Sequence, residues 1–373
     1  MERSEQPKLE KPITGTGGEF LEKRKELRLP AIEVKNKVIS LNPAFEGTLP
    51  FKIEQGKPLP FAYFFTPTPS QSPEEKIHHV SVMPERGYKE VPGRGRSGLI
   101  GSVVFEDQQG RRYRDLGIKG IGVFNLSFDT GSAEVARVIE QGPHEALGLV
   151  NYPHAIRDWD YAEDFLRSGI RTYRIVAIAS LEEIVDENGQ KISVFEAKRL
   201  KIIPEGMNPV IEVRAFGTTE RIDYLASGGQ DRERMALDDA KALVAQELGK
   251  DPQKFSWEEY TEWFVKTLGQ QVAKIRNLGL HNGYLTSHNI TLDCRIVDLD
   301  SVASVRDKIE DYRRFGVIHS KEWFYKGDLS MARGSLQDLI SSLQRLGLLQ
   351  SLNSSSFIEL FNSEYQEELV RRE

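Results

Sequence analysis

The chain has 373 residues, 39% of them apolar, and a formal net charge of −6, a composition that predicts a globular protein with one two-lobed domain or two smaller ones. The acidic balance and the lack of a concentrated basic patch argue against a nucleic-acid-binding protein. No run of about 18 apolar residues occurs and the N-terminus is charged, so we expect neither a membrane partner nor a signal segment, and a cytoplasmic location.

Residues 1–60 are charged and rich in turn residues, which predicts a partly irregular N-terminal arm. The aromatic run at 61–65 follows, and we interpret it as a core segment, because such runs are usually buried.

Residues 61–226 have the pattern of a small, mainly β lobe. Glycines punctuate the stretch from Gly93, and strands are expected at 102–105 and 113–119 around a turn at 107–110. The second strand ends in Lys119, followed by Gly120, and a glycine-rich hairpin leading to a lysine is typical of a kinase N-lobe. Glycines let backbone N–H groups approach phosphates. Hairpins of this kind without a ligand are also common.

A helix is predicted at 156–168, with Gly169 as its C-cap, after an irregular connection at 123–152. Its Glu163 is either the carboxylate that pairs with the strand lysine or a solvated helix-face residue. Strand-like runs at 170–180 and 210–216 complete the small sheet. Arg214 and Arg221 are either phosphate ligands or surface arginines.

Residues 227–373 are predicted to form a helical lobe after a linker at 227–229. A helix is expected at 231–248. The capping box of Ser256 and Glu259 opens a long amphipathic helix that ends at Gly279. Further helices are expected at about 301–316, 335–350 and 355–371. The fold class is therefore α+β, a two-lobed protein-kinase-like fold.

The stretch from His281 to Asp300 predicts a metal site. The chain's one cysteine, Cys294, follows Asp293 in a predicted hairpin turn, which would bring Asn289 and Asp298 to one rim. An amide oxygen and a carboxylate, completed by phosphate oxygens, suit Mg²⁺ or Mn²⁺. A kinase loop carries its catalytic aspartate five residues before this asparagine, where Tyr284 stands here.

With these residues in place, the sequence resembles the selenoprotein O family, kinase-fold enzymes that act as protein adenylyltransferases. The likeness extends from about Gly93 to Asp300. Residues 116–122 are similar to the family's L-Q-L-K-G-A-G strand, 156–159 to its I-R-E-F helix, and 282–289 to its H-G-V-M-N-T-D-N loop. Arg214 and Arg221 reproduce the spacing of its two phosphate-contacting arginines.

The resemblance implies that ATP binds inverted relative to kinases and that AMP passes to a Ser, Thr or Tyr hydroxyl of a protein, with self-modification as one outcome. It implies that Lys119 and Gly120 bind the nucleotide and that Glu163 orients Lys119. Arg214 and Arg221 would neutralise the terminal phosphate, and Asn289 and Asp298 would hold Mg²⁺ or Mn²⁺.

The sequence departs from the family pattern at three places. His288 replaces the aspartate expected as general base, and an imidazole can either take the proton or cap the loop. Asp300 replaces the glycine of the D-Y-G triplet. The C-terminal part is shorter and has no redox cysteine or selenocysteine. Two alternative functions remain open, an ATP-dependent phosphotransferase or kinase, and a nucleotide-binding pseudokinase scaffold.

Overall fold

The computed structural model describes residues 27–49, 52–59, 62–65, 77–82, 97–122, 125–126, 133–134, 148–186, 189–226, 229–349 and 354–371. The chain divides into two compact units. Unit 1 comprises Met1–Trp159 and Arg174–Phe216, and unit 2 comprises Asp160–Tyr173 and Gly217–Glu373. Within the described ranges, no helix is both long and apolar enough to cross a bilayer.

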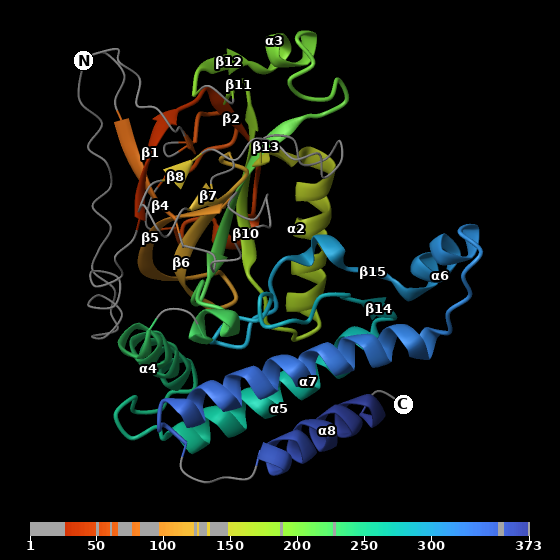
Figure 1. The fold of residues 1–373 in the computed structure, drawn as a ribbon. Coiled ribbons are helices and arrows are strands. Elements are labelled where there is room, and N and C mark those ends of the chain that lie inside the picture. Colours follow the sequence, from red (N-terminus) through yellow and green to blue (C-terminus); the bar gives the residue numbers. More distant parts are fainter. Residues whose placement is uncertain are drawn as a thin grey trace. The chain divides into compact units, whose positions relative to one another are not determined.

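Unit 1 is built on one antiparallel sheet with strand order β2-β10-β13-β6-β5-β4-β1-β3, and β9 also pairs with β13 (Figure 1). The strands are β1 (Leu27–Glu33), β2 (Asn36–Leu41), β3 (Tyr63–Phe65), β4 (Ile77–Val82), β5 (Ser97–Glu106), β6 (Arg112–Lys119), β9 (Val150–Asn151), β10 (Arg174–Leu181) and β13 (Pro209–Phe216). The N-terminal arm thus supplies β1 and β2 to the sheet. The glycines at 93 and 95 lie outside the described residues.

Short elements accompany this sheet. They are the 3-10 helix η1 (Pro43–Phe45), the strand pairs β7 (Asn125–Leu126) with β8 (Ala133–Glu134) and β11 (Glu183–Val185) with β12 (Lys191–Ser193), and the helix α3 (Val194–Arg199).

The predicted hairpin of β5 and β6 is confirmed. Its turn is closed by Asp107, whose carboxylate accepts hydrogen bonds from the backbone N–H groups of Gln109 and Arg111, both at 2.9 Å. An aromatic cluster of Phe45, Phe105 and Tyr113, with ring centroids 5.5–5.8 Å apart, packs beneath it. Burial of such rings is a large apolar contribution to the core of unit 1.

Near Lys119, the facing parts of β6 and β13 place apolar and charged side chains on opposite faces by strand alternation. Ile118 and Val213 stand opposite each other and enter the hydrophobic core. The alternate positions, Lys119 opposite Glu212 and Gly117 opposite Arg214, share the other face.

Helix α2 (Tyr152–Arg167) agrees with the predicted helix, although it begins four residues earlier. Gly169 follows it with a φ of 70°, the left-handed conformation that glycine adopts at helix ends. Strand β10 begins later than predicted, because Thr172 instead forms a parallel bridge with Ile296 within unit 2.

Unit 2 is mainly helical. Its helices are α4 (Gln230–Glu247), α5 (Trp257–Asn277), α6 (Val305–Arg314), α7 (Lys321–Arg345) and α8 (Ser354–Val370), with the 3-10 helices η3 (Ile222–Ala226) and η4 (Leu299–Ser301) and the short strands β14 (Leu280–His281) and β15 (Ala303–Ser304). The capping box is confirmed, since Ser256 and Glu259 exchange side-chain and backbone hydrogen bonds.

The prediction for α7 was wrong at its start, which lies at Lys321 instead of near residue 335. Ser320 caps the helix by accepting the N–H of Trp323. Two glycines inside the helix, Gly327 and Gly334, weaken the sequence pattern but are tolerated there, at a cost of about 1 kcal/mol each relative to alanine.

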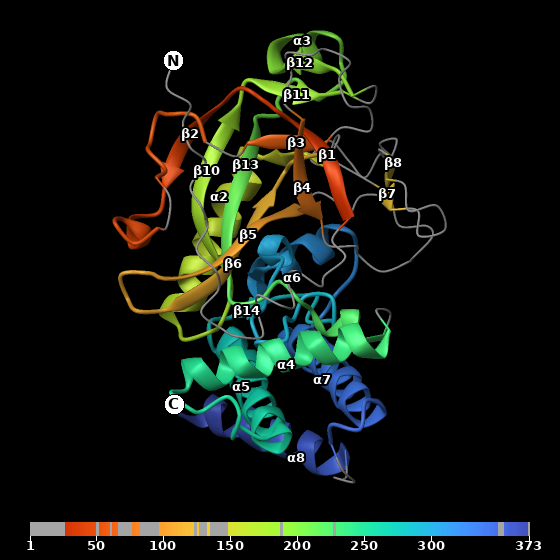
Figure 2. The ribbon, with the colours of Figure 1, turned by 90° about the vertical axis from the view of Figure 1, so that its left-hand side faces the viewer.

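Helices α5, α7 and α8 lie side by side (Figure 2). The contact between α5 and α8 is close at Gly269, where an added Cβ would lie 2.7 Å from the carbonyl oxygen of Phe361. Only glycine allows this approach of the two backbones.

We predict that Gly269→Val lowers the free energy of unfolding of unit 2 by about 1 to 3 kcal/mol, because overpacking forces α5 and α8 apart. Thermal denaturation followed by circular dichroism measures the change. Gly334→Ala is the matched control, since its Cβ would meet nothing within 4 Å and its helix propensity is better. Equal melting temperatures for Gly269→Val and the wild type would contradict the close packing.

Candidate functional site

The predicted hairpin of unit 2 is confirmed. Ile290 and Ile296 form an antiparallel bridge, and the backbone N–H of Val297 donates to the carbonyl oxygen of Asn289 at 2.9 Å. Cys294 makes the turn with a φ of 59°. Asp298 directly follows the last bonded pair, so Asn289 and Asp298 stand at the open end of the hairpin, as the sequence predicts.

The side chain of Asn289 is oriented by its own loop. Its Nδ2 donates to the carbonyl oxygen of Tyr284 at 3.1 Å, and because the amide nitrogen and oxygen lie on opposite sides of the group, Oδ1 is directed away from that contact. An amide oxygen so placed suits a hard cation.

Asp298 has a left-handed backbone, with φ 64° and ψ 65°. This conformation costs a non-glycine residue roughly 1 to 2 kcal/mol, and such strain gathers at functional sites. No group of three or more His, Cys, Asp or Glu side chains that could hold a metal occurs among the described residues. The predicted site needs only one carboxylate, with an amide and phosphate oxygens as the other ligands.

The loop before the hairpin is fixed by Asp328 of α7. Its carboxylate accepts the backbone N–H groups of Asn282 and Gly283, both at 2.8 Å, and lies 3.1 Å from Nδ1 of His281. Sequence reasoning missed Asp328, because this part of α7 was not predicted to be helical.

His288 and Arg221 meet on this loop. Arg221 donates from Nη1 to the carbonyl oxygen of His288 at 2.6 Å, and Nδ1 of His288 lies 3.9 Å from the carboxylate of Asp223. The imidazole is about one-third exposed, at 36%. The His288 backbone is therefore held by Arg221, while its side chain faces a carboxylate that can stabilise its protonated form.

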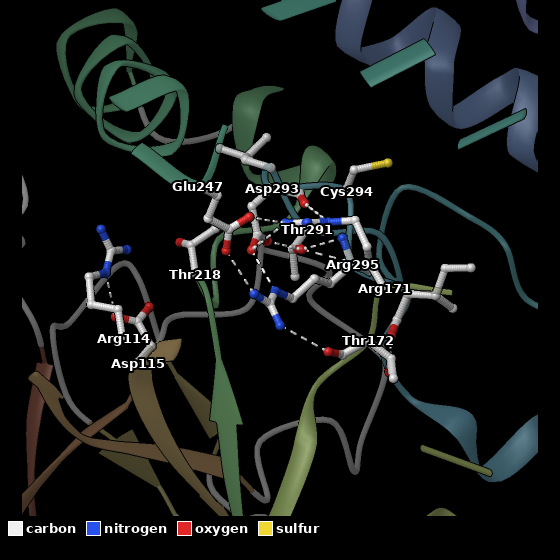
Figure 3. A network of polar contacts seen from close by, with 12 residues as sticks. Arg114, Asp115, Arg171, Thr172, Thr218, Glu247, Thr291, Asp293, Cys294 and Arg295 are labelled. Atoms are coloured by element: carbon white, nitrogen blue, oxygen red, sulfur yellow. Dashed lines mark hydrogen bonds and ion pairs between the residues drawn. The ribbon is translucent and has the colours of Figure 1, made fainter. Parts of the chain in front are cut away.

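A cluster of charges ties the hairpin to the rest of unit 2 (Figure 3). Arg295 donates to Asp293 at 2.7 Å, to Glu247 at 3.0 Å and to the carbonyl oxygen of Thr172 at 3.1 Å. Arg171 donates to Glu247 at 2.6 Å and to the carbonyl oxygen of Asp293 at 3.2 Å. Three segments distant in sequence are thus joined by two guanidinium groups.

The chemistry of this cluster follows from its burial. Burial alone would raise the pKa of Glu247, but the charges of Arg171 and Arg295 more than offset it and hold that pKa below its ordinary value. Cys294, beside the cluster, is fully buried, and burial raises the pKa of its thiol.

Unit 1 holds the predicted nucleotide-binding lysine. Lys119 is 3% exposed, and its Nζ lies 3.3 Å from the carboxylate of Asp158 on α2. Asp158 is itself 1% exposed. Glu163 lies on the same helix, in the part that belongs to unit 2, and its pairing with Lys119 stays a prediction.

Two further charges share the face of Lys119. Glu212 is fully buried opposite it, and Arg214 is 3% exposed, with its guanidinium 5.3 Å from the ring of Phe216. Sequence reasoning missed Asp158 and Glu212. Strand alternation with Arg214 was a signal that could have revealed Glu212. Arg214 belongs to unit 1 and Arg221 to unit 2.

Gly120 has a packing reason to be glycine. Its φ is +94°, and an added Cβ would lie 2.6 Å from the carbonyl oxygen of Val210. The close approach of β13 therefore excludes a side chain directly after Lys119. A contact of Gly120 with a nucleotide stays a prediction.

Comparison with known proteins gives only remote likenesses. No protein-family model matches the chain, and no curated protein matches it. Among solved structures, the chain is similar to a rhoptry antigen kinase domain of Toxoplasma gondii, with 8% identity, a TM-score of 0.34, and 80% of this chain and 83% of that one covered. It is also similar to ROP2 of Toxoplasma gondii, a virulence factor with a protein-kinase fold and no enzymatic activity, with 8% identity, a TM-score of 0.32, and 79% and 77% covered. Likenesses this remote support no inference about activity.

The fold class rests on the elements of the chain itself. Unit 1 contains a hairpin that ends in a buried lysine, a helix that carries the carboxylate partner of this lysine, and two later strands of the same sheet, β10 and β13. Unit 2 contains helices and a loop with an Asn and an Asp. This is the element order of a kinase-like fold, so the α+β prediction is confirmed.

We predict that Glu247→Gln lowers the free energy of unfolding by about 2 to 3 kcal/mol at neutral pH, because it removes the charge paired with two arginines. The folded-state pKa of Glu247 is lowered, so its contribution is present above the unfolded-state pKa and is lost as pH falls through the folded-state value. The wild type and the variant should therefore converge in acid.

Urea denaturation at a series of pH values measures this difference. Glu262→Gln is the matched control, since Glu262 forms an exposed pair with Lys266 and should cost no more than about 0.5 kcal/mol. A Glu247→Gln loss that stays constant down to acid pH would refute the electrostatic origin.

Proposed function

We propose that this chain is a divergent member of the selenoprotein O family that binds ATP with Mg²⁺ or Mn²⁺ and transfers AMP to a hydroxyl side chain of a protein. The observation that carries the proposal is the pair of buried cations on one face of neighbouring strands, Lys119 on β6 and Arg214 on β13. A kinase N-lobe uses one strand lysine for the phosphates.

The second cation, the guanidinium of Arg214, is important because it would offset the negative charge of the phosphates. When ATP is inverted, its β- and γ-phosphates are the buried end and carry most of the negative charge. A guanidinium beside the ammonium offsets that charge in a region of low dielectric, where the interaction is stronger than in water. Asp158, whose carboxylate lies 3.3 Å from Nζ of Lys119, holds this ammonium in place until phosphate oxygens compete for it.

The metal would be held by Oδ1 of Asn289 and the carboxylate of Asp298, whose positions at the end of the hairpin fit an oxygen-binding cation. When bound, it would neutralise phosphate charge in the transition state. Asp300 lies in η4 directly after this pair. Its carboxylate would extend the same acidic rim.

AMP transfer forms a bond between the acceptor oxygen and the α-phosphorus and breaks the bond from that phosphorus to the bridging oxygen, so pyrophosphate leaves. His288 is proposed to take the acceptor proton. Asp223, 3.9 Å from Nδ1, would stabilise the imidazolium, so Nε2 is the atom assigned to the proton. Tyr284 stands where a kinase has its catalytic aspartate, which favours this reaction over ordinary phosphoryl transfer.

We expect protein to be labelled by α-labelled ATP and not by γ-labelled ATP when the purified chain is incubated with Mg²⁺ or Mn²⁺, because AMP is the group transferred. Asp298→Asn should abolish metal-dependent labelling. Asp307→Asn, a change at an exposed helix position, is the matched control and should label normally.

Label from the γ-position alone would identify a kinase and overturn the role of Arg214. Tight ATP binding with no label and no pyrophosphate release would identify a nucleotide-binding pseudokinase scaffold.

We predict that His288→Ala slows AMP transfer by about 10²- to 10⁴-fold, the usual contribution of a general base, while the dissociation constant for ATP changes little. Replacing the side chain leaves intact the backbone carbonyl that Arg221 contacts, so the loop should keep its shape. Rates of pyrophosphate release and ATP titrations separate the two effects. A parallel loss of rate and affinity would make His288 a loop cap.

A further inference from the structure

Tyr284 is held in the loop that carries the proposed metal ligand. Its backbone N–H donates to Oδ1 of Asn282 at 3.1 Å, and its carbonyl oxygen accepts from Nδ2 of Asn289 at 3.1 Å. Asp328 anchors the preceding turn through the N–H groups of Asn282 and Gly283. The backbone of Tyr284 is thus fixed on both sides by side chains.

The phenol ring of Tyr284, unlike its backbone, is exposed to solvent. Tyr284 is 60% exposed, while its neighbour Leu285 is fully buried. The other exposed tyrosine of this unit, Tyr312, is 38% exposed and packs on the rings of His319 and Trp323. Within the described part of the chain, Tyr284 makes no such ring contact. A large side chain kept exposed on a rigid loop suggests a chemical use.

The position of Tyr284 indicates what that use is. Five residues before the metal-binding asparagine, kinases place the group that touches the acceptor hydroxyl. Here the same place holds a hydroxyl. The nearby Ser287 is a poorer acceptor, because it is 7% exposed and donates its own hydroxyl hydrogen to Asp338.

We propose that Tyr284 is the acceptor of AMP within its own chain, a self-modification site that rests on the proposed adenylyl transfer. The phenol oxygen bonds to the α-phosphorus of ATP, the bond from that phosphorus to the bridging oxygen breaks, and pyrophosphate leaves. The phenol proton passes to His288 and then to water. The product is a tyrosyl-AMP phosphodiester, at one per chain.

Holding the acceptor on the loop of Asn289 makes the reaction intramolecular, which removes the entropic cost of bringing two proteins together. Modification also places a bulky anion on that loop, so each chain should react once and then stop. The rate of labelling per chain should not depend on protein concentration.

The test incubates the full chain with α-labelled ATP and Mn²⁺ or Mg²⁺ over a wide range of protein concentration, followed by intact-mass measurement and peptide mapping. We expect one AMP per chain, on Tyr284, with first-order kinetics. Tyr284→Phe keeps the ring and the backbone contacts and should lose the label while still binding ATP. Tyr312→Phe, the matched control, should label as the wild type.

Label on another residue, with Tyr284→Phe labelled as fully as the wild type, would overturn this assignment and leave the proposed function standing. Release of AMP and pyrophosphate without any protein label would identify hydrolysis of ATP and overturn both. No label and no pyrophosphate from a chain that binds ATP would overturn both the assignment and the proposed adenylyl transfer.

Discussion

The interaction on which unit 2 depends is the pairing of Arg171 and Arg295 with the carboxylates of Glu247 and Asp293. A guanidinium withdrawn from water costs several kcal/mol unless its donors are satisfied, so this cluster tolerates few alternative arrangements. A slip of the hairpin by one residue would move Arg295 to the opposite side and leave Glu247 with half its partners. The cluster therefore fixes the register that brings Asn289 and Asp298 to the same end.

The loop before the hairpin is also fixed by side chains. Its backbone groups are hydrogen-bonded by two side chains from within the loop, Asn282 and Asn289, and by Asp328 of α7. The side chain of Tyr284 is exposed to solvent, and that of His288 is about one-third exposed and faces Asp223. Transfer of a phosphoryl or nucleotidyl group needs little covalent help but strict positioning, and a loop built in this way provides it.

The sequence alone was sufficient to predict the elements whose structure is set by residues close to one another in the chain. The capping box at Ser256, the hairpin around Cys294 and the strand ending in Lys119 all depend on neighbours in the chain, and all are confirmed. The partners Asp158 and Glu212 were missed, because choosing them requires the register between β6 and β13 and the rotation of α2. The strand register and the helix rotation depend on packing between segments far apart in sequence, and they cannot be predicted from a short stretch of residues.

The buried thiol of Cys294 gives the molecule a built-in reporter. It is the single cysteine among 373 residues, fully buried at the hairpin turn, with its backbone carbonyl bonded by Gln271 at 3.0 Å. Burial raises the pKa of the thiol, so it stays protonated and unreactive while the hairpin is closed. An alkylating reagent can therefore react only during opening of this region, and its rate would measure how often the hairpin that carries Asn289 and Asp298 comes apart.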